Sequence, residues 1–567
     1  MDTKFIKKLI QKESKYYLYF GLSLILLLIM NLLAIIPPKL FQNIVDLYIP
    51  NKNLKSIYIT TAVMVLIPFL STTIDTYFTY VVWVKVKELS FIVKSRIFSK
   101  LLNQPMSFYK DNDSGKLASY LAIDTSNFFY FWLHDLPTAI SSGIMSIVIL
   151  VLLYKISPLI TIIMVLAGPA AVLPSFFLGK KSQSLAAEIV DYDSEINSKI
   201  TESFKFVKLI KSQCSQKQRI DEINTINAKN LKIFGKAVIT ETLSLTVSKE
   251  LVGAIFTAIA FILCSIGVMN NNITIGELIA FTAYLPRLFG LFNVLSSSNV
   301  YIQKQLGLQN KNFEFLAMDD EYKNSPTKSG QEILGSVTFN NLKFSYDDSR
   351  DILKNISFSI NQGEFVTIMG DSGCGKSTML DLLLDFYKAP PNSIKIDGMD
   401  INLYPLDYLR SNIALVSQNI SLLRGSLRYN LALAYPKATD EDILRVIEEA
   451  ELSDVVNKLP EGLDTDLSEN GVNLSGGERQ RLALAMALLR KPKILLLDEV
   501  SASLDLEAEK RILDTIEKLC RNENLTVISV THRRSFIKDS FRVVAMENGE
   551  VKYDGQYKDY LERSCVV

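Results

Sequence analysis

The chain of 567 residues is poor in the residues that build disulfides and metal centres. Its five cysteines are scattered without metal-type spacing, and it has only two histidines. An odd number of scattered cysteines predicts a reducing compartment without disulfides. An excess of positive charge is also missing, because 61 Lys and Arg oppose 60 Asp and Glu. This balance argues against a nucleic-acid partner.

Charge is missing from long stretches of the first three hundred residues. A bilayer-spanning helix needs about 20 apolar residues. A turn at Lys155–Pro158 and the triplet Asn270–Asn272 separate neighbouring stretches, so we predict six spans. The first is too long and too early for a cleaved signal peptide. The stretches with no charge or a single one are 16–38, 56–84, 136–154, 156–179, 251–276 and 278–303.

Basic residues are unevenly distributed around these spans. They are numerous in the amino terminus and in two long connections, 85–135 and 180–249, and few in the short ones. This bias predicts a cytoplasmic amino terminus, cytoplasmic long connections and a cytoplasmic carboxyl-terminal half. Residues 85–105 and 180–245 place apolar residues at helical spacing among charges. We therefore expect spanning helices that continue into the cytosol, with a separate soluble insertion as the alternative.

Residues 369–378, MGDSGCGKST, form a loop suited to phosphate. The loop satisfies G-x-x-x-x-G-K-[ST] between a predicted strand at 364–369 and a predicted helix at 377–386. Its glycines would let backbone N–H groups curl round phosphate oxygens at the positive end of a helix. We expect Lys376 to pair with the β- and γ-phosphates and the Ser377 hydroxyl to bind Mg²⁺. The predicted nucleotide-binding residues of the loop are Gly370, Ser372, Gly373, Cys374, Gly375, Lys376, Ser377 and Thr378.

A second apolar run, Ile494–Leu497, ends in two carboxylates. Asp498 is placed to coordinate Mg²⁺, usually through water, and Glu499 to activate the attacking water. Taken alone, a buried strand followed by surface carboxylates would be common. Together with the phosphate loop, the pair predicts a site that hydrolyses a nucleoside triphosphate.

Upstream of these carboxylates, residues 474–478 read LSGGE. With this motif the chain resembles the ABC transporters, and the resemblance covers nearly its whole length. It implies an α-helical membrane domain of the exporter (type IV) fold in residues 1–320, with six transmembrane helices and long cytoplasmic extensions. A linker at 321–336 would lead to an α/β P-loop ATPase domain with an ABC signature subdomain, at 337–567.

The resemblance also implies roles outside the two phosphate motifs. Tyr346 matches the aromatic residue that stacks on adenine. Gln418 matches the Q-loop glutamine that senses Mg²⁺, and His532 matches the switch histidine on the γ-phosphate. The implied metal ligands are Ser377, Gln418 and Asp498. The implied catalytic residues are Glu499, His532 and Gln418.

The signature motif implies a partner. In this family its serine and glycines cap the γ-phosphate of ATP held by the other copy, so two chains would close over two ATP molecules. With one membrane domain and one ATPase domain, the chain resembles half a transporter. Competent residues at the matched positions favour a homodimer, with a heterodimer as the alternative. The residues implied in this part of the ATP site are Ser475, Gly476, Gly477, Glu478 and the D-loop Asp505.

The implied function is ATP-driven export, or flipping, of an amphipathic substrate such as a drug, small peptide or lipid. The cofactors would be ATP and Mg²⁺, and the location the lipid bilayer of the cytoplasmic (inner) membrane. ATP contacts both ATPase domains only when they are closed, so its binding would drive alternating access. Two other interpretations remain open, an importer that uses the exporter fold and a membrane ATPase that regulates without transporting.

Two charges within predicted spans, Asp75 and Arg287, are candidates for the substrate path. A charge at mid-bilayer is unfavourable by about 3 kcal/mol, so each should face a wet cavity or the other. Arg287 would attract an anionic group of the substrate, unless it lies near the cytosol and snorkels. Residues 108–124 and 206–219 resemble the family's two cytoplasmic coupling regions.

Overall fold

The computed structural model describes most of the chain as two compact units. The described residues are 15–246, 251–326, 331–346, 351–468, 471, 473–500, 506–532, 537 and 541–564. One unit, called here the helical unit, comprises Met1–Gln104 and Tyr109–Asp319. The other, called the sheet unit, comprises Pro105–Phe108 and Asp320–Val567.

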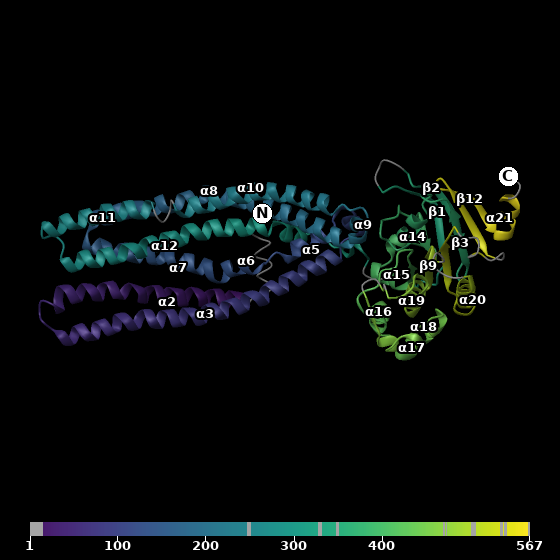
Figure 1. The fold of residues 1–567 in the computed structure, drawn as a ribbon, viewed down its shortest axis with the longest axis horizontal. Helices are drawn as coiled ribbons and strands as arrows, with labels where there is room; N and C mark the ends of the chain where they lie inside the picture. The colour runs from purple at the N-terminus through teal and green to yellow at the C-terminus, as the bar shows by residue number, and fades with distance from the viewer. Residues whose placement is uncertain are drawn as a thin grey trace. The chain divides into compact units, whose positions relative to one another are not determined.

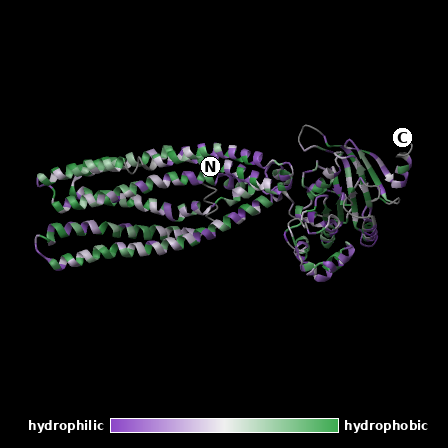
Figure 2. Cartoon of the chain, in the orientation of Figure 1, coloured by the Kyte–Doolittle hydropathy of each residue, from purple (hydrophilic) through white to green (hydrophobic). Residues whose placement is uncertain are grey.

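The helical unit contains the six predicted spans. Among the described residues, six helices are long and apolar enough to cross a membrane, which confirms the prediction. Hydrophobic residues dominate them over the part that ends in short connections (Figure 2). Their bounds are Tyr16–Tyr48, Leu54–Leu102, Ser114–Ile156, Pro158–Lys205, Val252–Met269 and Ile275–Leu308.

Figure 1 labels most of the helices that make up these spans and the connections between them. The spanning elements are α2 (Lys15–Asn43), the π-helix η1 (Ile44–Tyr48), α3 (Leu54–Leu102), α7 (Leu136–Ile156), α8 (Pro158–Lys205), α11 (Val252–Met269) and α12 (Ile275–Leu308). The third span also includes three short elements before α7, namely α5 (Ser114–Ala122), α6 (Ser126–Tyr130) and η2 (Phe131–Asp135). The other elements of the unit are α4 (Met106–Asp111), α9 (Val207–Ser212), α10 (Gln216–Thr246) and α13 (Asn310–Ala317).

Two helices run far beyond the thickness of a bilayer. α3 has 49 residues and α8 has 48. At 1.5 Å per residue each is about 70 Å long, more than twice the roughly 30 Å hydrocarbon core. α10 packs along α8, where Asn230 Nδ2 donates to Asp193 Oδ1 over 2.7 Å. The connections are therefore continuations of the spanning helices rather than a separate insertion.

Local sequence accounts for the breaks between spans. Ser157 is extended, with φ −152°, and Pro158 starts α8, because proline is favoured in the first turn of a helix, where no preceding turn would accept the N–H that proline lacks. After the asparagine triplet, α12 begins with a capping box in which the Thr274 side chain accepts from the Glu277 N–H and the Glu277 carboxylate accepts from the Thr274 N–H. The core of this unit lies along α12, where Phe281, Leu285, Leu288 and their neighbours are buried.

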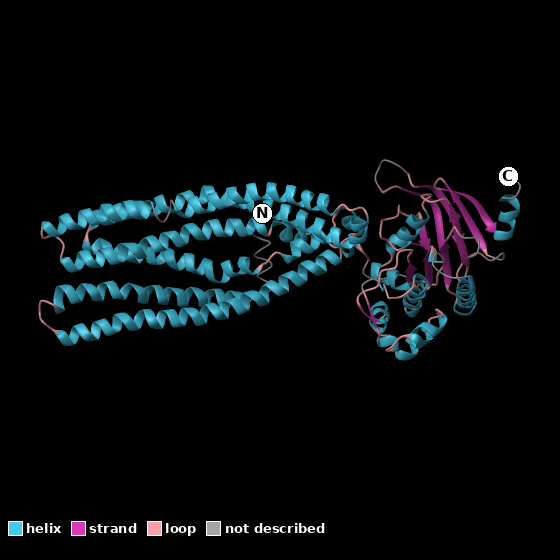
Figure 3. Ribbon diagram, in the orientation of Figure 1, coloured by secondary structure: helices cyan, strands magenta, loops and turns pink. Residues whose placement is uncertain are grey.

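The sheet unit is built on two main sheets (Figure 3). The first is antiparallel with the order β2-β1-β4-β5, and the second has the order β12-β11-β3-β10-β9-β6. In the second, β11, β3, β10, β9 and β6 run parallel, and β12 pairs antiparallel at the edge. The strands of these sheets are β1 (Val337–Phe344), β2 (Leu353–Ile360), β3 (Phe365–Gly370), β4 (Ile394–Ile396), β5 (Met399–Asp400), β6 (Ile413–Val416), β9 (Ile494–Asp498), β10 (Thr526–Val530), β11 (Arg542–Glu547) and β12 (Glu550–Gln556).

The strand sequences explain the parallel sheet. Every residue of β10 is buried, as are Ile494–Leu497 of β9, because helices cover both faces of a parallel sheet. The helices of this unit are α14 (Lys376–Leu383), α15 (Leu406–Asn412), α16 (Leu427–Ala434), α17 (Asp440–Glu449), α18 (Ser453–Lys458), α19 (Gly476–Leu489), α20 (Leu506–Glu523) and α21 (Tyr557–Ser564). β7 (Gly425–Ser426) and β8 (Asp466–Leu467) form a short ribbon beside α16.

The segment before β1 is tied into the sheet unit. Arg410 forms an ion pair with Glu321 at 2.8 Å. The Asp397 carboxylate, in the turn after β4, accepts backbone N–H groups from Leu334, Gly335 and Ser336. The described residues of 321–336 are therefore held by side chains of the sheet unit.

Candidate nucleotide-binding site

The predicted catalytic residues follow four neighbouring strands. β3, β10, β9 and β6 lie side by side and run parallel, in register near their carboxyl ends. The phosphate loop follows β3, His532 follows β10, Glu499 follows β9 and Gln418 follows β6. Ligands of open α/β sheets bind outside the carboxyl ends of the strands. The structure therefore brings the predicted residues to the edge where a ligand is expected.

Two glycines shape the phosphate loop. Gly370 ends β3 with φ +153°, and a Cβ there would lie 2.3 Å from the Met546 carbonyl oxygen. Gly375 is the N-cap of α14 with φ +100°, and a Cβ there would lie 2.5 Å from the Leu353 side chain. Both positions thus require glycine. The loop can then present backbone N–H groups at the N-terminus of α14, where an anion is favoured.

Lys376 is held inside this loop. Its side chain is buried, and Nζ donates to the carbonyl oxygens of Gly370 at 2.7 Å and Asp371 at 2.8 Å. These acceptors are neutral, so an anionic phosphate oxygen would be a stronger partner for the ammonium. Cys374 is buried in the same place, with Sγ 3.7 Å from Nζ. The thiol therefore fills space in the loop and does not face solvent.

Asp498 and Ser377 lie next to each other. Ser377 Oγ donates to Asp498 Oδ1 over 3.4 Å. Burial raises the pKa of Asp498 above its usual value, and the charge of Glu499 adds to this, while Ser377 and Lys376 oppose it. A carboxylate that is costly to keep charged gains from a nearby cation, so the pair is suited to Mg²⁺.

Glu499 lies at the centre of a hydrogen-bonded cluster. Gln418 Nε2 donates to its Oε2 over 2.5 Å, and His532 Nδ1 lies 3.1 Å from its Oε1. The backbone of Glu499 has φ +51°, a left-handed conformation that costs a non-glycine residue about 1–3 kcal/mol. Its N–H donates to the Val530 carbonyl over 2.9 Å, which fixes it against β10. Of the three predicted catalytic residues, Gln418 and His532 thus each contact Glu499.

The donor set fits ATP and Mg²⁺. Among the described residues, no group of three or more His, Cys, Asp or Glu could hold a metal ion. Mg²⁺ does not need such a cage, because it commonly takes one or two protein oxygens together with water and substrate phosphates. The Ser377 hydroxyl and the Asp498 carboxylate supply those oxygens beside the phosphate loop, and Gln418 is joined to them through Glu499.

Tyr346 lies against the helix of the phosphate loop. Its hydroxyl donates to Thr378 Oγ1 over 3.1 Å. Its ring makes an edge-on contact with Tyr387, with centroids 4.8 Å apart, and a second with Phe344. The ring is therefore fixed next to the loop, and stacking on adenine stays a prediction.

The signature turn forms the start of α19. The Ser475 side chain accepts from the Glu478 N–H over 3.3 Å, and the Glu478 carboxylate accepts from the Ser475 N–H over 2.7 Å. This capping box satisfies two of the N–H groups that a helix start leaves free. Gly476 and Gly477 form the first turn of the helix. The predicted D-loop residue Asp505 lies outside the described residues.

Asp381 lies near the site but belongs to none of the sequence motifs named above. It lies on α14, and burial raises its pKa, with Asp498 adding to the shift. Asp381 is four residues after Ser377, a spacing that puts both on the same face of a helix. This spacing from Ser377 is the sequence feature from which Asp381 could have been predicted as a neighbour of the site. Asp381 adds to the negative charge that a cation would neutralise here.

The two charges predicted for the substrate path are not paired with each other. Within the described part of the chain, Asp75 on α3 and Arg287 on α12 make no ion pair, and both are half-buried. Arg287 lies about 18 Å along α12 from its start at Ile275, at 1.5 Å per residue. If the roughly 30 Å hydrocarbon core begins at the start of α12, Arg287 would lie near its middle, so its place in the substrate path stays a prediction.

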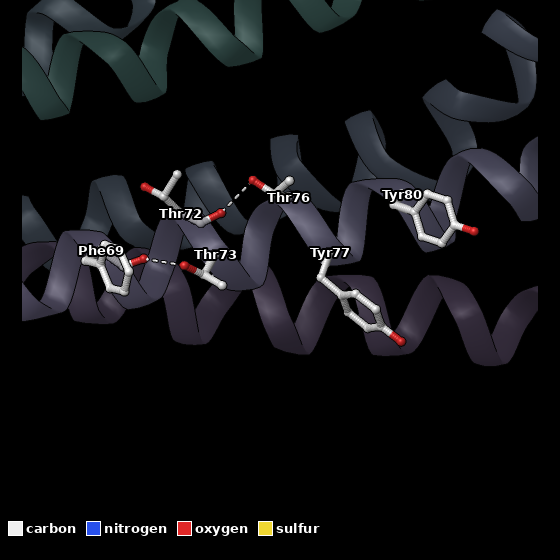
Figure 4. Close-up of a pocket in the computed structure, with 6 residues that line it drawn as sticks. All are labelled: Phe69, Thr72, Thr73, Thr76, Tyr77 and Tyr80. Atoms are coloured by element: carbon white, nitrogen blue, oxygen red, sulfur yellow. Dashed lines mark hydrogen bonds between the residues drawn. The ribbon is translucent and has the colours of Figure 1, made fainter.

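A groove of about 560 Å³ lies on α3 (Figure 4). The Thr73 and Thr76 hydroxyls donate to backbone carbonyls of their own helix. Figure 4 shows the hydroxyls of Tyr77 and Tyr80 pointing away from the helix. The face is thus both aromatic and rich in hydroxyl groups. The lining residues are Phe69, Thr72, Thr73, Thr76, Tyr77 and Tyr80.

Comparison with known proteins identifies the family. A model of the ABC transporter transmembrane region matches residues 20–292, and a model named ABC transporter matches residues 353–502. The chain is 32% identical over 488 residues to the ATP-dependent lipid A-core flippase of Pasteurella multocida (strain Pm70), covering 84% of this chain and 82% of that one. It is 28% identical over 564 residues to the leukotoxin translocation ATP-binding protein LktB of Mannheimia haemolytica, covering 97% and 77%.

A solved structure shares the fold. A bacterial Atm1-family ABC exporter with ATP bound matches with a TM-score of 0.88 at 24% identity, over 96% of each chain. The match confirms the predicted fold class, a six-helix exporter-type membrane domain fused to an ABC ATPase domain. The chain belongs to the ABC transporter family, as a half-transporter whose ATPase domain drives transport by ATP hydrolysis.

Proposed function

We propose that the chain is one half of a homodimeric exporter that moves an amphipathic lipid or peptide out of the cytoplasm. The amino terminus, the long helical extensions and the ATPase domain would lie in the cytoplasm, with residues 1–320, 321–336 and 337–567 as membrane domain, linker and ATPase domain. The observation that carries the proposal is the contact of Gln418 and His532 with Glu499, at the sheet edge next to the phosphate loop.

In this proposal Glu499 accepts the proton of the attacking water. Gln418 and His532 each contact one of its carboxylate oxygens, and each oxygen keeps a further lone pair that can accept from water. The two contacts would hold the carboxylate in place for this step. Gln418 donates to Glu499 through its side-chain nitrogen, so its side-chain oxygen stays available as the predicted metal ligand. When bound, Mg²⁺ would neutralise charge on the phosphates.

Two copies are needed to complete the ATP site. The Ser475 N–H is taken by Glu478, but the Ser475 hydroxyl proton has no acceptor within the capping box. We propose that this hydroxyl and the first turn of α19 face the γ-phosphate of ATP held by the phosphate loop of the second copy. Closure of the pair over ATP then reshapes the membrane domains.

The substrate path would combine Arg287 with the α3 groove. The two relatives are named for the translocation of a lipid A core and of a leukotoxin, so a lipid or a peptide is the proposed cargo. Arg287 is a half-buried cation at bilayer depth without an ion-pair partner among the described residues, and it suits an anionic group. The hydroxyl and aromatic side chains of the α3 groove suit an amphipathic body.

Transport into inside-out membrane vesicles tests the direction. We expect ATP-dependent accumulation of a fluorescein-labelled amphipathic peptide, or ATP-dependent movement of a fluorescent phospholipid between leaflets. Glu499→Gln vesicles with equal amounts of protein are the matched control, and they should show neither. ATP-driven loss of the probe from preloaded inside-out vesicles would instead identify an importer. ATP hydrolysis without movement of either probe would favour a membrane ATPase that regulates without transporting.

Arg287→Ala tests the substrate path. We expect the ATPase stimulation caused by an anionic amphipath to fall by about tenfold, the factor of one lost charged contact. Stimulation by a neutral amphipath of the same length should stay unchanged. Arg287→Lys keeps the positive charge and should retain most of the stimulation. Equal responses of Arg287→Ala to both amphipaths would remove Arg287 from the path.

A further inference from the structure

Asp46 joins two parts of the helical unit that are far apart in the sequence. It lies in η1, at the tip of the hairpin formed by α2 and α3, and it faces the start of α12. Asp46 Oδ1 accepts from the Gly276 N–H over 3.0 Å, and Oδ2 accepts from the Thr274 hydroxyl over 2.8 Å. One carboxylate therefore holds the hairpin tip to the first turn of the last span.

This contact is closely fitted. A helix start carries unpaired N–H groups and a positive dipole, so a carboxylate is a strong partner there. Gly276 is buried, and a Cβ at this position would lie 2.4 Å from the carboxylate atoms of Asp46. Only glycine lets the two backbones come this close. Gln42 adds a weaker bond to the same carboxylate over 3.4 Å.

The rest of the hairpin is mostly exposed within one copy. The share of buried residues in the most apolar stretch is 11% for the first span and 6% for the second, against 39%, 33% and 39% for the third, fourth and sixth. α2 packs against α7 and α12, where Asn31 donates to Ser141 Oγ and Tyr284 donates to the Ile35 carbonyl. Asp46 thus adds a charged contact at the end of an arm that is otherwise held by apolar packing and neutral hydrogen bonds.

The arm also contains a place to bend. Pro37 and Pro38 lie inside α2, and each lacks the N–H that would bond the preceding turn. The π-helix Ile44–Tyr48 follows, and kinks in helices concentrate at prolines and π-bulges. Asp46 therefore lies beyond a weakened stretch of helix, so that its segment can move away from α12 without unfolding the remainder of α2.

We propose that Asp46 is a latch that keeps the helical unit closed at the end with the short connections, and that it releases Gly276 and Thr274 when the passage opens there. The inference rests on the proposed function, because an alternating-access exporter has to open this extracytoplasmic end. The latch acts before any nucleotide binds, so its effect can be measured separately from ATP hydrolysis.

The test is a distance measurement on the full-length protein in lipid nanodiscs. Spin labels are placed at Ile49→Cys and Met269→Cys, which are exposed and lie just beyond the hairpin tip and at the end of α11. Serine replaces the exposed Cys214 and the carboxyl-terminal Cys565, and the other three cysteines are buried. Double electron–electron resonance spectroscopy then gives the distribution of distances between the spin labels, without nucleotide and with ATP.

Asp46→Ala should raise the nucleotide-free population with long label distances by about tenfold, the factor of a lost hydrogen bond to a charged group. Gly276→Ala should give the same shift by pushing the carboxylate away, and it covers the case in which Asp46→Ala does not fold. Glu277→Gln is the matched control, since among the described residues this acid bonds to the Thr274 N–H and not to Asp46, and a glutamine oxygen can still accept from that N–H. It should leave the distances unchanged.

The latch is contradicted if both Asp46→Ala and Gly276→Ala keep the wild-type distances, or if Glu277→Gln shifts them equally. Failure of the proposed function looks different. In that case ATP leaves the label distance unchanged in the Glu499→Gln chain with an intact latch. If ATP lengthens that distance while Asp46→Ala has no effect without nucleotide, only the latch is wrong.

Discussion

Glu499 combines strain with a complete set of hydrogen bonds. Its left-handed backbone is unfavourable, yet the bond to Val530 and the contacts of its carboxylate with Gln418 and His532 hold it in place. Strained residues persist where the surroundings fix them, and they concentrate at functional sites. The left-handed turn after β9 accompanies the placement of the Glu499 carboxylate between Gln418 and His532.

Glu499→Gln is expected to lower the rate of ATP hydrolysis by about 10²- to 10⁴-fold, the usual contribution of a general base. Binding of ATP should remain, because the phosphate loop is untouched. Phosphate release and binding of a fluorescent ATP analogue measure the two effects. Glu507→Gln is the matched control, since this acid is fully exposed on α20. Hydrolysis at the wild-type rate by Glu499→Gln would exclude Glu499 as the base.

Alanine substitutions at two glycines of the phosphate loop distinguish the cost of backbone strain from the cost of a steric clash. Gly370 and Gly373 both have positive φ, but a Cβ at Gly370 would meet the Met546 carbonyl, whereas a Cβ at Gly373 has nothing within 4 Å. We expect Gly370→Ala to abolish ATP binding and Gly373→Ala to weaken it by about tenfold or less, in line with the roughly 1 kcal/mol cost of a left-handed alanine. Equal losses in a nucleotide-binding titration would contradict this order.

The start of α19 shows what the glutamate of LSGGE contributes to a helix start. Glutamate and glutamine are both acceptors for the N-cap N–H in a capping box, so the turn keeps its geometry with either. The side chain of Glu478 therefore acts on the helix start and not only on a ligand.

Glu478→Ala should lower the stability of the full-length protein by about 1 kcal/mol through loss of half the capping box. Glu478→Gln should leave it unchanged, because the amide oxygen can accept from the Ser475 N–H. Chemical denaturation followed by circular dichroism measures both. If Glu478→Gln is as destabilised as Glu478→Ala, the charge and not the cap is what the helix needs.

Elements with a strong local pattern could be predicted from the sequence. The spans follow from missing charge, and the apolar run Ile494–Leu497 lies within β9 (Ile494–Asp498). Gln418, Glu499 and His532 could be named from motifs, but the contacts of Gln418 and His532 with Glu499 depend on the strand order of the sheet, which no motif states. The bond between Asp46 and Gly276 joins residues 230 positions apart, so the local sequence carries no sign of it.

The proposed transporter has to share each ATP molecule between two copies of the chain. The phosphate loop and the signature turn are both intact in this chain, so each copy can supply one half of two equivalent sites. A symmetric pair in which each surface contacts the other's counterpart is the commonest form of homodimer. The prediction is that damage to one half-site can be compensated only by a different chain.

Coexpression of two chains, each inactive by itself, tests most directly whether the ATP site is shared between two copies. Lys376→Ala removes the phosphate-loop lysine and Ser475→Ala removes the signature hydroxyl, and each chain alone should lack ATPase activity. A mixed dimer keeps one intact phosphate loop facing one intact signature turn. The coexpressed, membrane-purified mixture should therefore regain roughly a quarter of the wild-type rate, from half the dimers with one of two sites. A mixture as inactive as its parents, or full activity of Ser475→Ala alone, would contradict the shared site.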